Sequence, residues 1–157
     1  MGSKNCNSKN IVNFLTEYTD KLKDGLDSID SESLEKIANL IDEVVKNNKT
    51  IYTCGNGGSS AIADHFVCDF LKGSAADSTI QPIIHSLTSN TPTITAIAND
   101  ISYDDIFSCQ IEKYGNSDDI LLSISSSGNS QNIIKAIEKA KAKNLTTISF
   151  VGFDGGK

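Results

Sequence analysis

The amino-acid sequence predicts an α/β fold, a doubly wound and mostly parallel β-sheet with helices on both faces. Two observations predict it. Short apolar runs rich in β-branched residues alternate with helical segments along residues 49–157, a pattern typical of right-handed βαβ units. The two loops richest in glycine and serine, residues 55–60 and 125–130, each directly follow one of these runs. Because ligands of parallel sheets bind at the carboxyl ends of the strands, both loops are candidates for a functional site.

Two amphipathic helices are expected over residues 8–48, before the alternating region begins. In the first helix, apolar residues recur at helical spacing from Ile11 to Leu26. In the second, Asp30 or Ser31 is placed to cap the first turn of an apolar face that runs to Val45. We therefore expect a single domain over residues 1–157, with N-terminal helices over 8–48 and an α/β core over 49–157.

Each element of the core follows from a local pattern. The β-rich runs predict four strands, at residues 50–54, 82–87, 120–125 and 146–151. Helical spacing predicts helices at residues 59–72, 93–98, 103–112 and 132–143. Pro92 suits the first turn of the second of these helices, where its missing N–H has no partner to lose. The sequence stops at a loop just after the fourth strand, so we expect that the core lacks the helix that would normally close it.

Composition and charge exclude several classes of protein. Hydrophobic residues make up 38% of the chain and charged residues 22%, which is ordinary for a globular domain. No apolar run approaches the roughly 18–20 residues of a membrane helix, and no secretory signal opens the sequence. The net charge of −6 argues against a nucleic-acid partner. The four cysteines show no metal or disulfide spacing, so we expect reduced thiols in a cytoplasm, with Cys54 and Cys68 buried.

The serine-rich loop is the stronger of the two candidate anion sites. Residues 125–130 read Ser-Ser-Ser-Gly-Asn-Ser, and hydroxyls this dense at a helix start exceed what capping requires. They can donate several hydrogen bonds to phosphate oxygens at a point where the helix dipole also favours an anion. The alternative is a polar loop with a serine cap, and we favour the phosphate site.

The glycine-rich loop is less specific. Residues 54–60 read Cys-Gly-Asn-Gly-Gly-Ser-Ser, between a strand and a helix. Glycines let a ligand approach the backbone closely, but the spacing matches neither the dinucleotide fingerprint nor a Walker A loop. A tight turn with glycines for geometry alone explains the loop equally well.

His65 and Asp69 are four residues apart and so share one face of the expected helix. An imidazole and a carboxylate can ligate a metal ion or transfer protons. Two ligands alone do not make a zinc site, and His85 is expected to pack within a strand, so spacing by itself favours a hydrogen-bonded surface pair. Asn99 and Asp100 follow a helix end, where a plain helix stop is the simplest explanation.

These residues together resemble the sugar isomerase (SIS) domain family, and within it the phosphoheptose isomerase family. The matching runs are residues 54–59, 96–100, 119–122, 125–130 and 152–157. The resemblance implies a five-stranded, flavodoxin-like αβα sandwich that forms a homotetramer through its N-terminal helices. It implies interconversion of sedoheptulose 7-phosphate and D-glycero-D-manno-heptose 7-phosphate, the first step toward the heptose of lipopolysaccharide or capsule.

The resemblance also assigns roles to single residues. The implied substrate-binding residues are Asn56, Gly57, Gly58, Ser59, Asn99, Asp100, Ser125, Ser126, Ser127 and Ser130. His65 and Asp69 stand where the family has a metal-ligating histidine and a glutamate that also transfers protons, which implies a zinc cofactor and catalytic roles for both.

Two departures from the family pattern affect the catalytic set. Asp69 replaces the family's glutamate, which moves the carboxylate by about 1.5 Å for a base that needs hydrogen-bond reach. The helix that brings the family's other histidine and a glutamine is not among these 157 residues. The alternative to an isomerase is therefore a non-catalytic SIS protein, either a sugar-phosphate sensor or a scaffold that binds a replication initiator.

Overall fold

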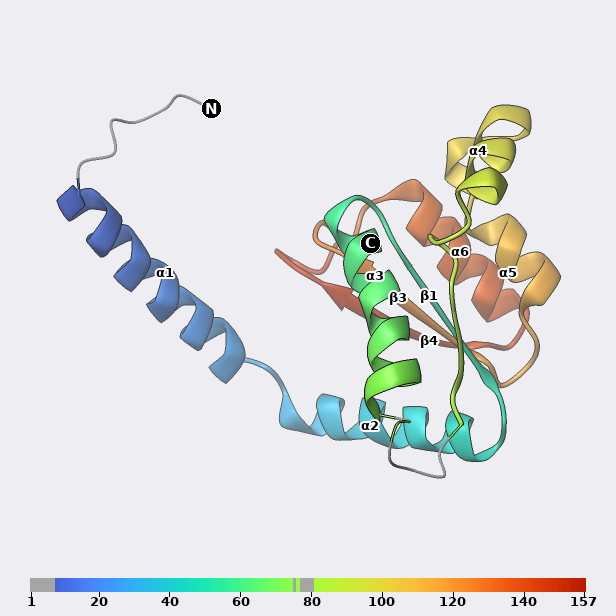
Figure 1. Cartoon of the computed structure of the whole chain (residues 1–157), viewed down its shortest axis with the longest axis horizontal. Helices are drawn as coiled ribbons and strands as arrows, with labels where there is room; N and C mark the ends of the chain where they lie inside the picture. Colours follow the sequence, from blue (N-terminus) through green and yellow to red (C-terminus); the bar gives the residue numbers. More distant parts are fainter. Residues whose placement is uncertain (1–7, 75, 77–80) are drawn as a thin grey trace. The chain divides into compact units, whose positions relative to one another are not determined.

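The structure, a computed structural model, describes residues 8–74, 76 and 81–157. The chain forms two compact units, residues 1–38 and 39–157. The first unit contains α1 (Ser8–Asp27) and the beginning of α2 (Ser31–Lys46) (Figure 1). Asp30 caps α2, because its carboxylate accepts hydrogen bonds from the backbone N–H groups of Glu32 and Ser33. The structure thus confirms both helices that the sequence predicts before residue 48. Cys6, which precedes them, lies outside the described residues.

Four parallel strands form the sheet of the second unit, in the order β2–β1–β3–β4. The strands are β1 (Thr50–Gly55), β2 (Ile83–Ser86), β3 (Ile120–Ser125) and β4 (Thr146–Val151). All four runs expected from the sequence are confirmed. The resemblance implies five strands, whereas the described residues form four. After Val151 the backbone turns at Phe153, Gly155 and Gly156, which have positive φ angles.

The helices of the core are where the sequence predicts them, but three of them differ in extent. The first, α3 (Gly58–Cys68), passes into a π-helical turn, η1 (Asp69–Ser74). The next, α4 (Thr91–Asp100), starts at the cap residue Asn90 and contains Asn99 and Asp100 in its last turn rather than ending before them.

The helix expected at residues 103–112 is two elements. A 3₁₀ turn, η2 (Tyr103–Asp105), precedes α5 (Ser108–Tyr114). The hydroxyl of Ser102 accepts a hydrogen bond from the N–H of Asp104, which starts the short turn before α5 begins. The last helix, α6 (Gln131–Ala142), agrees with the sequence.

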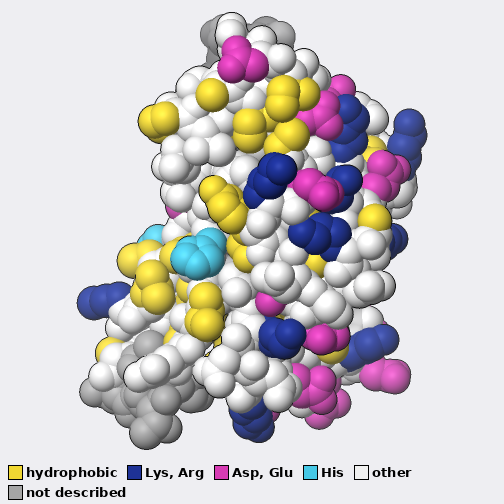
Figure 2. All heavy atoms as spheres, turned by 90° about the vertical axis from the view of Figure 1, so that its right-hand side faces the viewer, with side chains coloured by type: hydrophobic (Ala, Val, Ile, Leu, Met, Phe, Trp, Pro, Cys, Tyr) yellow, Lys and Arg dark blue, Asp and Glu magenta, His cyan; other side chains and the backbone are white. Residues whose placement is uncertain are grey.

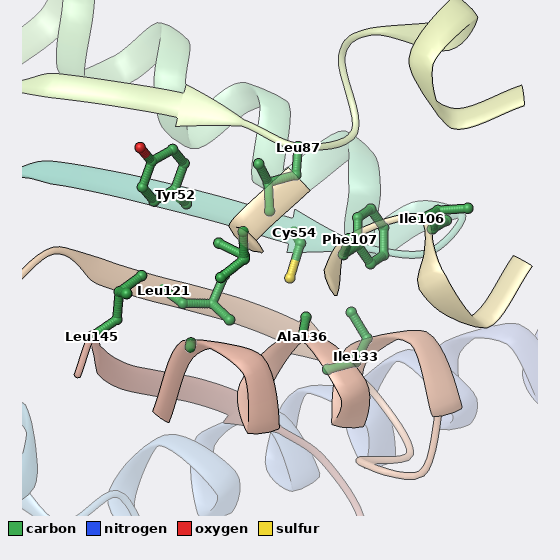
Figure 3. Packing of buried hydrophobic residues seen from close by; sticks show 11 residues of the cluster. Tyr52, Cys54, Leu87, Ile106, Phe107, Leu121, Ile133, Ala136 and Leu145 are labelled. Atoms are coloured by element: carbon green, nitrogen blue, oxygen red, sulfur yellow. The ribbon is translucent and has the colours of Figure 1, made fainter. Parts of the chain in front are cut away.

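Different helices bury the two faces of the sheet. On one face, side chains of β1 and β3 such as Tyr52 and Leu121 pack against α6 and against Phe107, which precedes α5 (Figure 3). On the other face, the hydroxyl of Thr53 donates a 3.0 Å hydrogen bond to the carbonyl of Ala63 and so fixes α3 against β1. The doubly wound αβα architecture is thereby confirmed, and its two helix layers fix the loops that follow β1 and β3.

The described cysteines are free thiols in different environments. Cys54 is fully buried as expected, and burial raises the pKa of its thiol to about 12. Cys68 is exposed, contrary to expectation, because α3 turns Ala63 and not Cys68 toward the sheet. None of the helices in the described part of the chain is long and apolar enough to cross a membrane.

Candidate functional site

The glycine-rich and serine-rich loops lie next to each other at the carboxyl edge of the sheet. They follow β1 and β3, which are adjacent parallel strands, and Gly55 pairs in register with Ile124. The structure therefore brings together the two loops that the sequence marked as candidates, at the edge where parallel sheets bind ligands.

A pair of asparagines connects the glycine-rich loop to the helix that follows the serine-rich loop. Asn56 Nδ2 donates to Asn132 Oδ1, and Asn132 Nδ2 donates to Asn56 Oδ1, each over 2.8 Å. The hydroxyl of Tyr103 donates to the same Asn56 oxygen over 3.2 Å. Asn132 is 2% exposed, and sequence reasoning missed it. The sequence marks Asn132 only as a polar residue in the first turn of the helix that follows the serine-rich loop.

The glycines of the first loop have different reasons to be glycine. A Cβ on Gly55 would lie 2.5 Å from the carbonyl oxygen of Ser59, so this position needs glycine for packing. Gly57 has a φ of +55°, which favours glycine, whereas a Cβ on Gly57 or Gly58 would meet no atom within 4 Å. The space beside Gly57 and Gly58 is thus open to a ligand at the start of α3.

The serine-rich loop uses its hydroxyl oxygens as hydrogen-bond acceptors. Ser125 Oγ accepts from the N–H of Gly128 over 3.1 Å, and Ser127 Oγ accepts from the N–H of Asn129 over 3.2 Å. A hydroxyl that accepts in this way keeps its proton free to donate to an anion. Ser130 starts α6 without a side-chain capping bond, so the plain serine cap is not what this loop forms.

The segment after β4 packs against the backbone of the serine-rich loop. The N–H of Gly152 donates to the carbonyl of Ser126 over 3.1 Å. Gly128, at φ +64°, touches Gly155 and Gly156 so closely that a Cβ would overlap the carbonyl oxygen of Gly155. These contacts fix the loop conformation before any ligand binds.

Asn99 and Asp100 are exposed at the end of α4, and Asn99 Nδ2 donates to Asp100 Oδ1 over 2.7 Å. In the described ranges, neither residue forms a hydrogen bond with the glycine-rich or serine-rich loop. Tyr103, three residues after Asp100 in the sequence, donates a hydrogen bond to Asn56 and so links this segment to the glycine-rich loop.

His65 and Asp69 meet on the exposed face of α3, with 3.4 Å between Nε2 and Oδ1 and side chains 72% and 65% exposed. Cys68 lies beside them, and one donor atom from each of the three residues lies within 4.8 Å of the others. His65 is seven residues beyond Gly58, about 10 Å along the helix axis from the glycine-rich loop. The proton-transfer candidates are therefore separated from the start of α3 by two helical turns.

His85 does not pack in the core, contrary to expectation. It lies on β2, an edge strand whose side chains alternate between exposed Ile83 and His85 and buried Ile84. Its ring centre is 6.3 Å from that of Tyr52. Figure 2 shows the histidine side chains on one face of the molecule, next to a group of hydrophobic side chains.

A family model described as the SIS domain matches residues 14–152. This chain belongs to the SIS domain family. The SIS chain is 44% identical over 141 residues to the phosphoheptose isomerase of Shewanella denitrificans, an alignment that covers 88% of this chain and 71% of the relative. It is 41% identical over 140 residues to the phosphoheptose isomerase of Helicobacter pylori, covering 89% of this chain and 72% of the relative.

Solved structures of the SIS domain family agree with the sequence comparison. The phosphoheptose isomerase of Francisella tularensis superimposes with a TM-score of 0.88 at 31% identity, covering 96% of this chain and 78% of that one. The phosphoheptose isomerase of Neisseria gonorrhoeae superimposes with a TM-score of 0.84 at 33% identity, with the same coverage. The resemblance to the SIS family and the SIS fold is thereby confirmed.

Proposed function

We propose that this SIS domain protein is a cytoplasmic phosphoheptose isomerase that interconverts sedoheptulose 7-phosphate and D-glycero-D-manno-heptose 7-phosphate. The observation that carries the proposal is the pair of adjacent loops after β1 and β3. In the serine-rich loop the hydroxyl protons of Ser125 and Ser127 are free to donate to a phosphate at the start of α6, in a chain 44% identical to a phosphoheptose isomerase. The product is a precursor of the heptose in lipopolysaccharide or capsule.

The serine-rich loop binds the phosphate in this proposal. The hydroxyls of Ser125 and Ser127 donate to phosphate oxygens, and the free N–H groups at the start of α6 add their partial positive charge. The substrate site comprises Asn56, Gly57, Gly58, Ser59, Asn99, Asp100, Ser125, Ser126, Ser127 and Ser130. Binding the phosphate away from the reacting carbons supplies energy that positions the sugar for reaction.

His65 and Asp69 move the proton in this proposal. Ketose–aldose isomerisation transfers a proton between adjacent carbons, and the intermediate is an enediol whose oxygen carries negative charge. A carboxylate within hydrogen-bond reach of the carbon-bound proton can take it and return it at the neighbouring carbon. The 3.4 Å approach of His65 keeps Asp69 beside a second group that exchanges protons with the sugar oxygens.

The donor atoms of this face of α3 fit a zinc ion, because an imidazole nitrogen and a carboxylate oxygen are ligands that zinc prefers. His65 and Asp69 would hold the ion. When bound, it polarises the sugar oxygens and stabilises the negative charge of the enediol.

The quaternary structure we propose is a homotetramer formed through the N-terminal helices. The apolar residues of α1 recur on one helical face: Ile11, Phe14, Leu15, Tyr18, Leu22 and Leu26. An apolar face of this length on a helix is typical of a subunit interface.

Turnover of sedoheptulose 7-phosphate, followed by NMR of the aldose product in the presence of zinc, tests the function. Ser127→Ala removes one charge-assisted hydrogen bond, worth about 1.5–3 kcal/mol, so KM should rise about 10- to 100-fold. Ser117→Ala is the matched control, because Ser117 is an exposed serine before β3, at the opposite edge of the sheet. Absence of aldose from wild-type protein with zinc contradicts the isomerase, and equal KM values for the two variants contradict the phosphate site.

A further inference from the structure

Cys68 adds a third donor atom to the pair formed by His65 and Asp69. A sulfur, a ring nitrogen and a carboxylate oxygen from these residues lie within 4.8 Å of one another. The three positions are i, i+3 and i+4 on α3 and the beginning of η1, and these positions share one face of a helix. All three side chains are exposed, so no packed neighbour holds the donor atoms apart.

The separations agree with those of ligands on one tetrahedral ion. Zinc bonds of about 2.0–2.2 Å to nitrogen and oxygen place two such ligands about 3.4 Å apart. The distance between His65 Nε2 and Asp69 Oδ1 is 3.4 Å. A zinc–sulfur bond of about 2.3 Å requires about 3.6 Å between the sulfur and each of the others. Since the sulfur lies within 4.8 Å of both, each of these two distances must shorten by about 1.2 Å at most. Rotation about one side-chain torsion of an exposed cysteine provides that shift.

The backbone changes at the same place. α3 ends at Cys68, and the π-helical turn η1 begins at Asp69, whose N–H bonds to the carbonyls of both His65 and Phe66. Single π-helical turns inside helices occur frequently at functional sites. The change of helix type therefore marks this cluster independently of its donor atoms.

We propose that the thiolate of Cys68 is the third protein ligand of a zinc ion that His65 and Asp69 also bind. Imidazole, carboxylate and thiolate are all ligand types that zinc sites in proteins use. This inference deepens the proposed function and rests on it only for the identity of the sugar on which the zinc ion acts. On binding, the Sγ–zinc bond replaces the Sγ–H bond, and the thiol proton goes to solvent.

Cobalt(II) serves as the probe, because a thiolate ligand gives a near-ultraviolet charge-transfer band that nitrogen and oxygen ligands do not give. The matched control for Cys68→Ala is the double variant Cys6→Ala/Cys109→Ala, which keeps Cys68 together with the buried Cys54. We expect the band in the wild type and in the double variant, and none in Cys68→Ala. Zinc affinity of Cys68→Ala should fall at least about 10-fold, since loss of even an outer-shell partner costs about 10–100-fold.

Three results overturn the assignment of Cys68: no cobalt binding to the wild type, cobalt binding without the band, or a band that survives in Cys68→Ala. Circular dichroism of Cys68→Ala checks the fold, which an exposed side chain should not alter. Sedoheptulose 7-phosphate turnover separates this inference from the proposed function. If the wild type turns over the sugar but its cobalt form lacks the band, Cys68 is not a ligand and the isomerase proposal stands. If the band is present without turnover, Cys68 is a ligand and the isomerase proposal is contradicted.

Discussion

The side chains of Asn56 and Asn132, 76 residues apart in the chain, exchange two hydrogen bonds of 2.8 Å, one in each direction. This pair joins the glycine-rich loop after β1 to the first turn of α6. Since Tyr103 donates to the same oxygen of Asn56, the segment after α4, the glycine-rich loop and α6 meet at a single amide. The pair fixes the relative position of the loops before a ligand arrives, which lowers the cost of ordering them on binding.

Asn132→Ala should weaken substrate binding through Asn56. Removal of the partner leaves a part-buried amide without its hydrogen bonds, at a cost of about 1–3 kcal/mol. We expect KM for sedoheptulose 7-phosphate to rise about 10-fold while the far-ultraviolet circular dichroism spectrum stays unchanged. Gln131→Ala, at the exposed neighbouring position, is the control and should retain the wild-type KM. The same KM in both variants would show that the amide pair has no part in binding.

Gly128→Ala should destabilise the fold and abolish phosphate binding. Its φ of +64° costs an L-residue about 1–2 kcal/mol, and its Cβ would overlap the backbone at Gly155. Urea unfolding should therefore show a loss of at least that free energy. In Gly25→Ala the new Cβ meets no atom within 4 Å on α1, and this control should be neutral or up to about 1 kcal/mol more stable. Equal stability of the two variants would contradict the close contact of the serine-rich loop with residues 155–156.

The buried thiol of Cys54 makes stability fall at alkaline pH. Its pKa is raised from 9.0 to about 12 by burial. As the pH rises above 9, the thiol of the unfolded chain loses its proton while that of the folded chain keeps it, so the unfolded state gains stability. The contribution of Cys54 is fully present below pH 9 and is lost between pH 9 and 12, by up to about 1.4 kcal/mol per pH unit.

Urea unfolding of the wild type, Cys54→Ala and Cys109→Ala at several pH values between 8 and 11 (about one unit apart) measures this slope. Cys54→Ala should lose stability with pH less steeply than the wild type, and Cys109→Ala should follow the wild type. Parallel curves for all three proteins would mean that Cys54 titrates normally in the folded chain.

The sequence was sufficient for the strands and for the placement of the loops. Continuous apolar runs such as residues 120–125 have one plausible structure, a strand buried on both faces, and both polar loops follow from the strand ends. The split at residues 103–112 was not predictable from periodicity, because it depends on one local bond from Asp104 to Ser102. The fifth strand came from the resemblance to the family and had no run of its own in this sequence.

Tertiary context decided the rest of the site. Asn132 looked like any polar residue at a helix start, because its partner lies 76 residues away. Cys68 was expected to be buried because nothing in the sequence marks it as an activated thiolate. The helical pattern over 59–72 is weakly amphipathic and does not determine which face meets the sheet. Only the position of Ala63 against Thr53 places Cys68 on the same exposed face as His65 and Asp69.

The central claim is that Asp69 moves the proton in sedoheptulose 7-phosphate isomerisation while the serine-rich loop after β3 holds the phosphate. The most direct measurement compares kcat and the affinity for inorganic phosphate in the wild type and in Asp69→Ala, both with zinc present. Loss of a positioned acid–base group should lower kcat at least about 100-fold, with phosphate affinity unchanged. Wild-type protein without turnover, or an Asp69→Ala variant that keeps its kcat, would contradict the claim.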